Sequence, residues 1–368
     1  MSTYPFDDLQ GAGTGSQDLT AGTQYTFNLT NNSGSSYFTM ETPRNFDGVT
    51  PRNLSGSITS ASSGVVFNQS DYIAGFALPT GNNSFVFTPS TNVTGSTLKL
   101  RGTGGIYVEL SGSGGSVIDA DAQAFLTAAA ITDPTITSAI DTLVVQLKAD
   151  NIWTKMKALY PFVGGTATTH KYNLKDPRDL DAAFRLTFSG GWAHSANGVL
   201  PNGTNAYADT KLIPNTTLSL NSTHISGYLR TTLTVSAPIL SSENLGTYNN
   251  GLYIWPKQVS FGYSVRINNN LSTSGGTRFD DIRGFHVALR TASAVKKYRL
   301  NNTERFNVTT ASTALNTSSI YIAASRNNAN YFNNELAFSS IGDGLTDAEA
   351  ANYYTAVQIF QTSLSRQV

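Results

Sequence analysis

Apolar and polar residues alternate with a two-residue period in many parts of this chain of 368 residues. The longest such run covers residues 259–268, and its apolar positions are Val259, Phe261, Tyr263, Val265 and Ile267. Successive side chains of a β-strand point to opposite faces, so this pattern predicts a strand with one buried face. Residues 285–289 and 320–325 repeat the pattern, and Asn301-Asn302 fits a two-residue hairpin turn. A sheet-rich C-terminal half is therefore expected.

The composition supports a mainly β protein and argues against a nucleic-acid binder. Charged residues make up only 13% of the chain, and 24 Lys and Arg residues balance 24 Asp and Glu residues. Abundant Gly, Ser, Thr and Asn indicate many polar turns. A protein that binds nucleic acid through electrostatics would need a basic face, which a neutral balance does not favour.

The chain contains no cysteine, which excludes disulfides and thiol chemistry. A secreted eukaryotic lectin of this size would usually carry disulfides, so their absence favours assembly in a reducing cytosol. The first residues show no basic region followed by an apolar run, and no apolar stretch approaches membrane-spanning length. We therefore expect neither a signal peptide nor insertion into a membrane.

Three regions follow from changes in pattern along the chain. Residues 1–111 show alternating segments separated by turn clusters, which predicts an N-terminal β-sandwich that serves as an anchor or assembly domain. Residues 112–165 predict a short helical linker or collar between two β domains, where copies of the chain meet. Residues 166–368 predict a C-terminal jelly-roll sandwich.

The linker prediction depends on a flexible start and on helix signals after it. Residues 112–116 are Gly and Ser only, as in a flexible joint. Asp133 is placed to cap a helix that has Pro134 at its first position. One apolar stripe of that helix contains Ile136, Ile140, Leu143 and Leu147. A third short helix is expected from Trp153, Met156 and Leu159, ending before Pro161.

Residues 318–364 combine an alternating strand, two asparagine turns, a Gly-Asp-Gly turn and a helix. Thr346 and Glu349 stand at capping-box spacing at the start of that helix. In order and spacing this segment resembles the closing segment of laminin-G-like, or concanavalin A-like, lectin domains. The resemblance implies a two-sheet lectin fold for the C-terminal domain.

A second resemblance covers residues 124–212, in which the passage ITDPT is followed by WTKMKALYPFVGG. This block resembles a module of bacteriophage virion proteins, particularly tail and head-fibre proteins of phages that infect Bacteroidetes. It implies a spike, fibre or decoration protein, made in the host cytoplasm and displayed on the exterior of the particle. It also implies a homotrimer or another cyclic oligomer, and contact with other virion proteins through the N-terminal domain.

No pattern of catalytic or metal-binding residues is evident. The four histidines form no zinc-type pair, and they are His170, His194, His224 and His286. Glycosidase chemistry needs two carboxylates across a cleft, whereas Asp280 and Asp281 are adjacent and would point to opposite faces of a strand. Asp209 or Asp280 would suit calcium, which is common in laminin-G-like domains, but no ligand spacing identifies a site. The sequence therefore predicts no enzyme, no metal site and no cofactor.

Binding of host-surface glycans is the function that the sequence favours. Aromatic rings stack on sugar C–H surfaces, while amide and charged groups bond to hydroxyls. The candidate residues are Trp192, Tyr248, Asn249, Asn250, Tyr253 and Trp255. The alternative for Trp192 and Trp255 is a position in the core. Two alternative functions remain, a purely architectural decoration protein without a ligand and a glycan-degrading enzyme.

Overall fold

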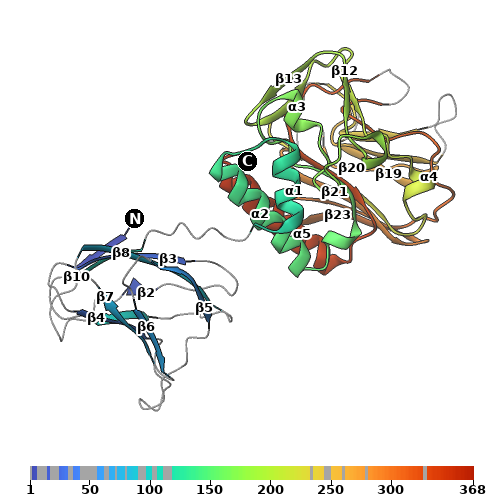
Figure 1. Ribbon diagram of the computed structural model, residues 1–368. Helices are drawn as coiled ribbons and strands as arrows, with labels where there is room; N and C mark the ends of the chain where they lie inside the picture. Colours follow the sequence, from blue (N-terminus) through green and yellow to red (C-terminus); the bar gives the residue numbers. More distant parts are fainter. Residues whose placement is uncertain are drawn as a thin grey trace. The chain divides into compact units, whose positions relative to one another are not determined.

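The computed structural model describes the strands between residues 2 and 110 by their backbone, and residues 118–368 except 233–234, 244–249, 259–261, 278–280 and 326–329. The chain forms two compact units, Met1–Ile118 and Asp119–Val368. Both are built mainly from antiparallel strands (Figure 1). The predicted joint at residues 112–116 lies outside the described residues, as do Val259 and Phe261.

The N-terminal unit contains two five-stranded antiparallel sheets, which fits the predicted β-sandwich. The strand order of the first sheet is β1 (Ser2–Pro5), β10 (Ile106–Leu110), β3 (Tyr25–Asn31), β8 (Gly81–Pro89) and β5 (Gly56–Ala61). The order of the second is β2 (Gly15–Ser16), β9 (Thr97–Arg101), β4 (Ser36–Glu41), β7 (Ile73–Leu78) and β6 (Val66–Ser70).

The C-terminal unit is a second sandwich, made of an eight-stranded and a seven-stranded sheet. The eight-stranded sheet has the order β13 (Trp192–Ser195), β14 (Gly198–Pro201), β25 (Leu336–Gly342), β16 (Thr223–Leu229), β21 (Gly284–Ala292), β22 (Val295–Leu300) and β23 (Thr303–Thr309), and β11 (Met156–Tyr160) also pairs with β25. The seven-stranded sheet has the order β12 (Thr187–Ser189), β15 (Tyr207–Asp209), β24 (Tyr321–Ile322), β17 (Leu240–Ser242), β18 (Gly251–Trp255), β19 (Tyr263–Asn269) and β20 (Thr273–Gly275).

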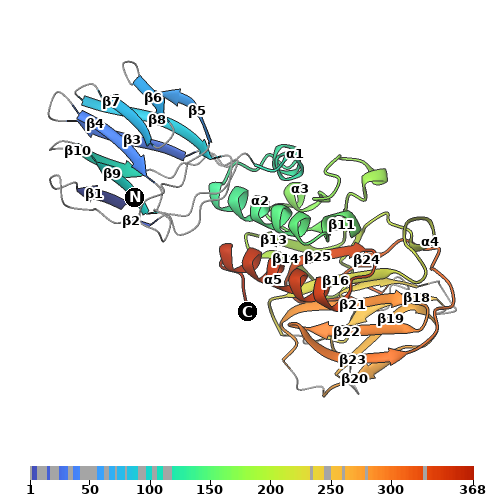
Figure 2. The same ribbon diagram turned by 90° about the horizontal axis from the view of Figure 1, so that it is seen from below.

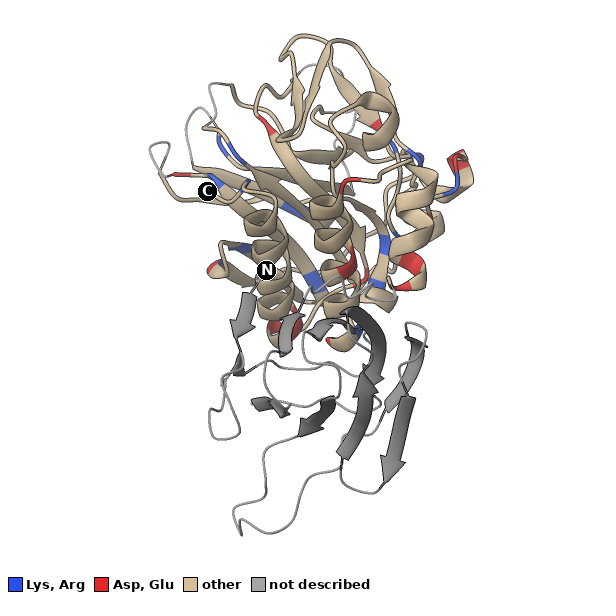
Figure 3. Cartoon of the chain, turned by 60° about the vertical axis from the view of Figure 1, so that its left-hand side comes forward, with Lys and Arg blue, Asp and Glu red and all other residues tan. Residues whose placement is uncertain are grey.

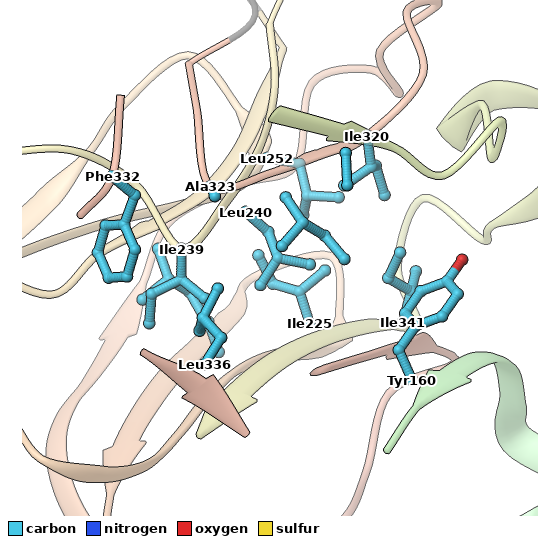
Figure 4. Close-up of a cluster of buried hydrophobic side chains, with 14 of the residues drawn as sticks. Tyr160, Ile225, Ile239, Leu240, Leu252, Ile320, Ala323, Phe332, Leu336 and Ile341 are labelled. Atoms are coloured by element: carbon cyan, nitrogen blue, oxygen red, sulfur yellow. The ribbon is translucent and has the colours of Figure 1, made fainter. Parts of the chain in front are cut away.

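Branched apolar side chains from both sheets fill the space between them (Figure 4). Leu240 and Ile322 of the seven-stranded sheet are completely buried, as are Ile225 and Ile341 of the eight-stranded sheet. Full burial of one such side chain stabilises the fold by about 1.5–3 kcal/mol. This core fixes which face of each strand points inward.

Three helices cover the side of the eight-stranded sheet that points away from the core (Figures 2 and 3). They are α1 (Ala120–Ala128), α2 (Pro134–Ala149) and α5 (Asp347–Ser363). Tyr353 of α5 packs on Phe285 of β21, with ring centroids 5.2 Å apart. The capping box predicted for Thr346 and Glu349 is present at the start of α5. Among the described residues, no helix is long and apolar enough to span a membrane.

Short helical turns complete the unit, and they are η1 (Trp153–Lys155), α3 (Ala167–His170), η2 (Asp181–Ala183) and α4 (Pro214–Thr217). The predicted third helix is wrong in part. Only η1 is helical, and residues 156–160 form β11 instead, because their alternate side chains enter the core while their backbone pairs with β25.

The helical segment is not a separate collar between two β domains. Both α1 and α2 lie within the C-terminal unit, which begins at Asp119. Ile140, Leu143 and Leu147 of the predicted stripe are at most 1% exposed. The stripe therefore packs within its own unit, where α2 lies against α5. The chain divides near residue 118, whereas the sequence predicted boundaries at residues 111 and 165.

Candidate functional site

The seven-stranded sheet turns one face to the core, and its other face carries polar and aromatic side chains. Leu240, Ile254 and Ile322 pair with one another across three strands and point into the core. Because strand side chains alternate, their neighbours Ser241, Tyr253 and Tyr321 point the opposite way. We call this opposite side the outer face.

Five residues from five adjacent strands form one row across the outer face. Asp209 is paired with Tyr321, and Tyr321 with Ser241. Ser241 is paired with Tyr253, and Tyr253 with Arg266. Directly paired residues have Cβ atoms about 4.5–5.5 Å apart, so neighbouring members of this outer row are in contact range. The helices lie on the other sheet (Figure 2).

Aromatic rings and a cation pack along the outer row. The rings of Tyr207 and Tyr321 stack with centroids 4.7 Å apart. The ring of Tyr253 meets Trp255 edge to face at 6.3 Å, and the guanidinium of Arg266 lies 5.1 Å from the Tyr253 centroid. Tyr207, Tyr321 and Trp255 are partly exposed, whereas Tyr253 is 6% exposed and Ser241 is fully buried, with its hydroxyl donating to the carbonyl of Ala324.

Glu243 directly follows β17 and lies two residues beyond Ser241. If the register that pairs Ser242 with Leu252 is continued by one residue, Glu243 comes opposite Gly251 on the outer face. A Cβ at Gly251 would lie 2.7 Å from Cδ of Arg266, so the glycine leaves room for the arginine side chain. The pKa of Glu243 is raised from its ordinary value by burial, against the opposing effect of the Arg266 charge. Raised carboxyl pKa values are typical of functional sites.

The structure places three predicted binding residues in or beside the outer row. Tyr253 is 6% exposed and belongs to the row, and Trp255 lies two residues further along β18. Asn250 precedes β18, where its backbone N–H donates to Oδ1 of Asn270 and its own Oδ1 accepts from the hydroxyl of Thr313. Tyr248 and Asn249 lie outside the described residues.

Trp192 is not part of this site. It lies on β13, at the edge of the eight-stranded sheet, and its indole N–H donates to the carbonyl of Ser189. Its ring packs edge to face on Phe188, with centroids 5.2 Å apart, and contacts the core. The structure thus supports the alternative, a packing role, for this tryptophan.

The predicted binding residues did not include five others in this part of the sheet, which are Asp209, Tyr207, Tyr321, Glu243 and Arg266. Alternation in residues 320–325 indicated that Tyr321 faces away from Ile322, but the sequence did not indicate which strands lie beside it. Asp209, weighed above for calcium, forms an ion pair with Lys211 at 3.0 Å. Among the described residues, no three metal-ligating side chains of His, Cys, Asp or Glu gather in one place.

The four histidines are held by burial or by hydrogen bonds within the fold. His224 and His286 are fully buried, and burial lowers the pKa of each to about 4. His170 and His194 lie with their Nδ1 atoms 3.0 Å apart. Nε2 of His170 accepts from the N–H of Gly165, so its Nδ1 carries the proton and donates to His194. Burial lowers the pKa of His170 to about 3, and the imidazole is neutral in the folded protein.

No protein-family model matches the chain, and no curated protein matches it. Among solved structures it is similar to domain 4 of an extracellular arabinanase from Geobacillus stearothermophilus in complex with arabinotriose. The identity is 13% and the TM-score 0.39, over 54% of this chain and 98% of that domain. It is also similar to a Trypanosoma rangeli sialidase in complex with sialic acid, at 9% identity and a TM-score of 0.38. That match covers 84% of this chain and 46% of the sialidase, so the chain spans less than half of the sialidase.

These comparisons contradict the prediction that the protein is not an enzyme, since a sialidase and a domain of an arabinanase are among the similar structures. Each of these two solved structures is a complex with a carbohydrate, arabinotriose in one and sialic acid in the other. TM-scores of 0.39 and 0.38 assign no activity, substrate or catalytic residue to this chain.

Proposed function

We propose that the C-terminal unit binds glycans on the outer face of its seven-stranded sheet. The observation that supports this most is the outer row itself, in which two tyrosines alternate with a carboxylate, a hydroxyl and a guanidinium across five paired strands. Aromatic faces offer apolar surface to sugar C–H groups, and the Asp209 carboxylate and the Arg266 guanidinium are suited to hydroxyls. The hydroxyl of Ser241 is buried and donates to the carbonyl of Ala324. The function is attachment to polysaccharide at a host surface.

A glycan array and calorimetric titration of the full chain test this proposal. The wild-type chain is expected to bind a subset of glycans, and Tyr321→Ala to weaken that binding at least tenfold. Tyr354→Ala is the matched control, because Tyr354 is also partly exposed but lies on α5, which covers the other sheet. Equal loss in both variants, or no binding by the wild type, would contradict the proposal.

The same samples test the alternative functions. Release of new reducing ends from a bound polysaccharide would identify a glycan-degrading enzyme. Absence of both binding and cleavage would favour an architectural decoration protein. A close pair of carboxylates in contact with the sugar would be the structural sign of hydrolysis.

The proposal includes a location on the exterior of a bacteriophage particle, as a spike, fibre or decoration protein. It is supported by the sequence resemblance of residues 124–212 to phage virion modules. In such a particle the N-terminal unit would contact other virion proteins, and a homotrimer or another cyclic oligomer would multiply weak glycan contacts. Mass spectrometry of purified particles and immunogold labelling test the location, and light scattering of the full chain tests the oligomer.

A further inference from the structure

Helices α2 and α5 each expose one side that points away from the eight-stranded sheet. The other side of each helix is buried within the C-terminal unit. The exposed residues are three or four positions apart, so on each helix they form one line. They are Thr135, Ser138, Thr142, Val145 and Ala149 of α2, and Ala348, Asn352, Thr355, Ile359 and Thr362 of α5. We call these ten residues together the helix face.

The helix face carries no charge. None of its ten residues is Asp, Glu, Lys or Arg, and residues 350–365 contain no charged residue at all. The two charged residues of α2 point towards the start of α1 instead. The Asp141 carboxylate accepts from the N–H of Asp119 at 2.7 Å. Lys148 forms ion pairs with Asp119 and Asp121, both at 2.6 Å. Because helix sides that remain in water normally carry charged residues, this composition favours contact with another uncharged surface.

Two branched apolar side chains are exposed on the helix face. Val145 of α2 is 49% exposed and Ile359 of α5 is 44% exposed. The two helices contact each other, so both side chains belong to one continuous surface. Interfaces between proteins have an apolar centre from which charged residues are depleted. The helix face has this composition.

The two helices run antiparallel and have nearly the same length. Nδ2 of Asn352, near the start of α5, donates to Oδ1 of Asp150 at the end of α2, at 3.1 Å. Figure 2 shows the helices side by side. With 16 and 17 residues, each is about 24 Å long, and two helices of about 10 Å diameter give a face about 20 Å wide. Over two copies this area is roughly 1,000 Å², which is enough for a specific interface.

We propose that the helix face packs against the same face of a second copy of this chain, so that α2 and α5 of both copies form a four-helix bundle. Antiparallel helices of equal length pack in this way. A two-fold axis brings the same surface of both copies together. A face without charge fits this arrangement, since no like charges meet across the axis.

This interface uses the side of α2 opposite the stripe predicted from the sequence. Ile140 and Leu147 of that stripe are buried within their own unit, whereas the helix face is open. The dimer leaves the outer face of the seven-stranded sheet free in each copy, because the helices cover the other sheet (Figure 2). The inference does not depend on glycan binding, but a dimer would multiply weak contacts to a polysaccharide.

Light scattering of the full chain at micromolar concentrations tests the dimer. The wild type is expected to have the mass of a dimer. Ile359→Glu is expected to weaken dimerisation at least tenfold, because it places an unpaired carboxylate inside the interface. Leu271→Glu is the matched control and is expected to leave the mass unchanged. Leu271 is also an apolar residue, 65% exposed, but it lies between β19 and β20 of the other sheet.

Cysteine cross-linking tests which surfaces meet. The chain contains no cysteine, so every disulfide must come from an introduced residue. Oxidation of Val145→Cys, of Ile359→Cys or of a mixture of the two is expected to give disulfide-linked dimers in at least one case. Leu271→Cys, treated in the same way, is expected to remain unlinked.

A monomeric or trimeric wild type overturns the inference. An oligomer whose mass is unchanged by Ile359→Glu, and whose helix cysteines form no cross-link, overturns it as well and shows that the copies meet through another surface. Circular dichroism checks that each variant is folded, and if Ile359→Glu does not fold, the cross-links decide. None of these results bears on glycan binding, which the glycan array tests separately.

Discussion

Tyr207 of β15 and Tyr321 of β24 stack with their ring planes only 16° apart and their centroids 4.7 Å apart. Their strands lie side by side through the pairing of Asp209 with Tyr321. The stack holds the Tyr321 ring beside Asp209, the residue at one end of the outer row. Substitutions of Tyr207 therefore perturb the proposed binding face without changing a core residue.

Replacing Tyr207 should separate ring stacking from hydrogen bonding. Tyr207→Ala is expected to weaken glycan binding about three- to tenfold, since an aromatic pair contributes about 0.5–1.5 kcal/mol beyond its buried area. Tyr207→Phe retains the stack and should bind like the wild type. Calorimetric titration measures both, and an equal loss in the two variants would show that the stack is not what matters.

The buried histidines predict a loss of stability in mild acid. Nδ1 of His224 donates to the carbonyl of Asp343, and Nδ1 of His286 accepts from the hydroxyl of Tyr298 while Nε2 donates to the carbonyl of Ile282. Burial lowers both pKa values from 6.5 to about 4. Below pH 6.5 the unfolded chain therefore binds protons that the folded chain does not, so the free energy of unfolding decreases as the pH is lowered.

Each of these histidines should reduce the unfolding free energy by about 1.4 kcal/mol per pH unit, or about 2 kcal/mol between pH 6.5 and 5. Urea unfolding of the full chain at pH 7, 6 and 5 measures this, with the transition of the C-terminal unit followed by tryptophan fluorescence. His286→Gln should remove its share of the slope. A slope that is unchanged by the substitution would contradict this account.

Arg290 is expected to be essential for stability because it binds several backbone carbonyls inside the sandwich. The residue is completely buried, and its guanidinium donates to the carbonyls of Ile267, Ser293 and Thr310. Arg290→Met keeps the length but leaves these acceptors unpaired, at a cost of at least about 3 kcal/mol.

Arg283→Met is the control for Arg290→Met. Its side chain is 44% exposed and pairs with Asp281 on the surface. Such an exposed ion pair contributes about 0–1 kcal/mol. Urea unfolding compares the two variants, and similar losses would show that the carbonyl contacts of Arg290 are unimportant.

The capping box at the start of α5 is expected to stabilise the fold without affecting glycan binding. The hydroxyl of Thr346 accepts from the N–H of Glu349, and the Glu349 carboxylate accepts from the N–H of Thr346. Thr346→Ala should lower the unfolding free energy by about 1 kcal/mol, and Thr346→Ser by much less. Neither variant should alter glycan binding, because α5 covers the opposite sheet. A change in affinity in Thr346→Ser would contradict the separation of the two faces.

Local patterns in the sequence predicted the features that depend on neighbouring residues. Asn301 and Asn302 form the expected hairpin turn, with positive φ angles of 48° and 61°, between β22 and β23. Asp133 caps α2 with Pro134 at its first turn, as predicted. Each of these signals involves a few adjacent residues whose backbone needs are specific.

Features that depend on distant residues were not predictable in the same way. Residues 156–160 are a short apolar run that fits a helix or a buried strand equally well, and pairing with β25 decides for the strand. The outer row could not be derived because a strand's pattern gives the facing of its side chains but not its neighbours or register. Glu243 follows a strand of only three residues, which is too short to show a period.

Hydrogen–deuterium exchange of the full chain, with and without a saturating glycan, tests the central proposal most directly. The outer face predicts that the sugar slows exchange in β17, β18, β19 and β24, while exchange in α1, α2 and α5 stays unchanged. Protection confined to the helices or to the β13–β14 hairpin would place the sugar elsewhere and contradict the proposal.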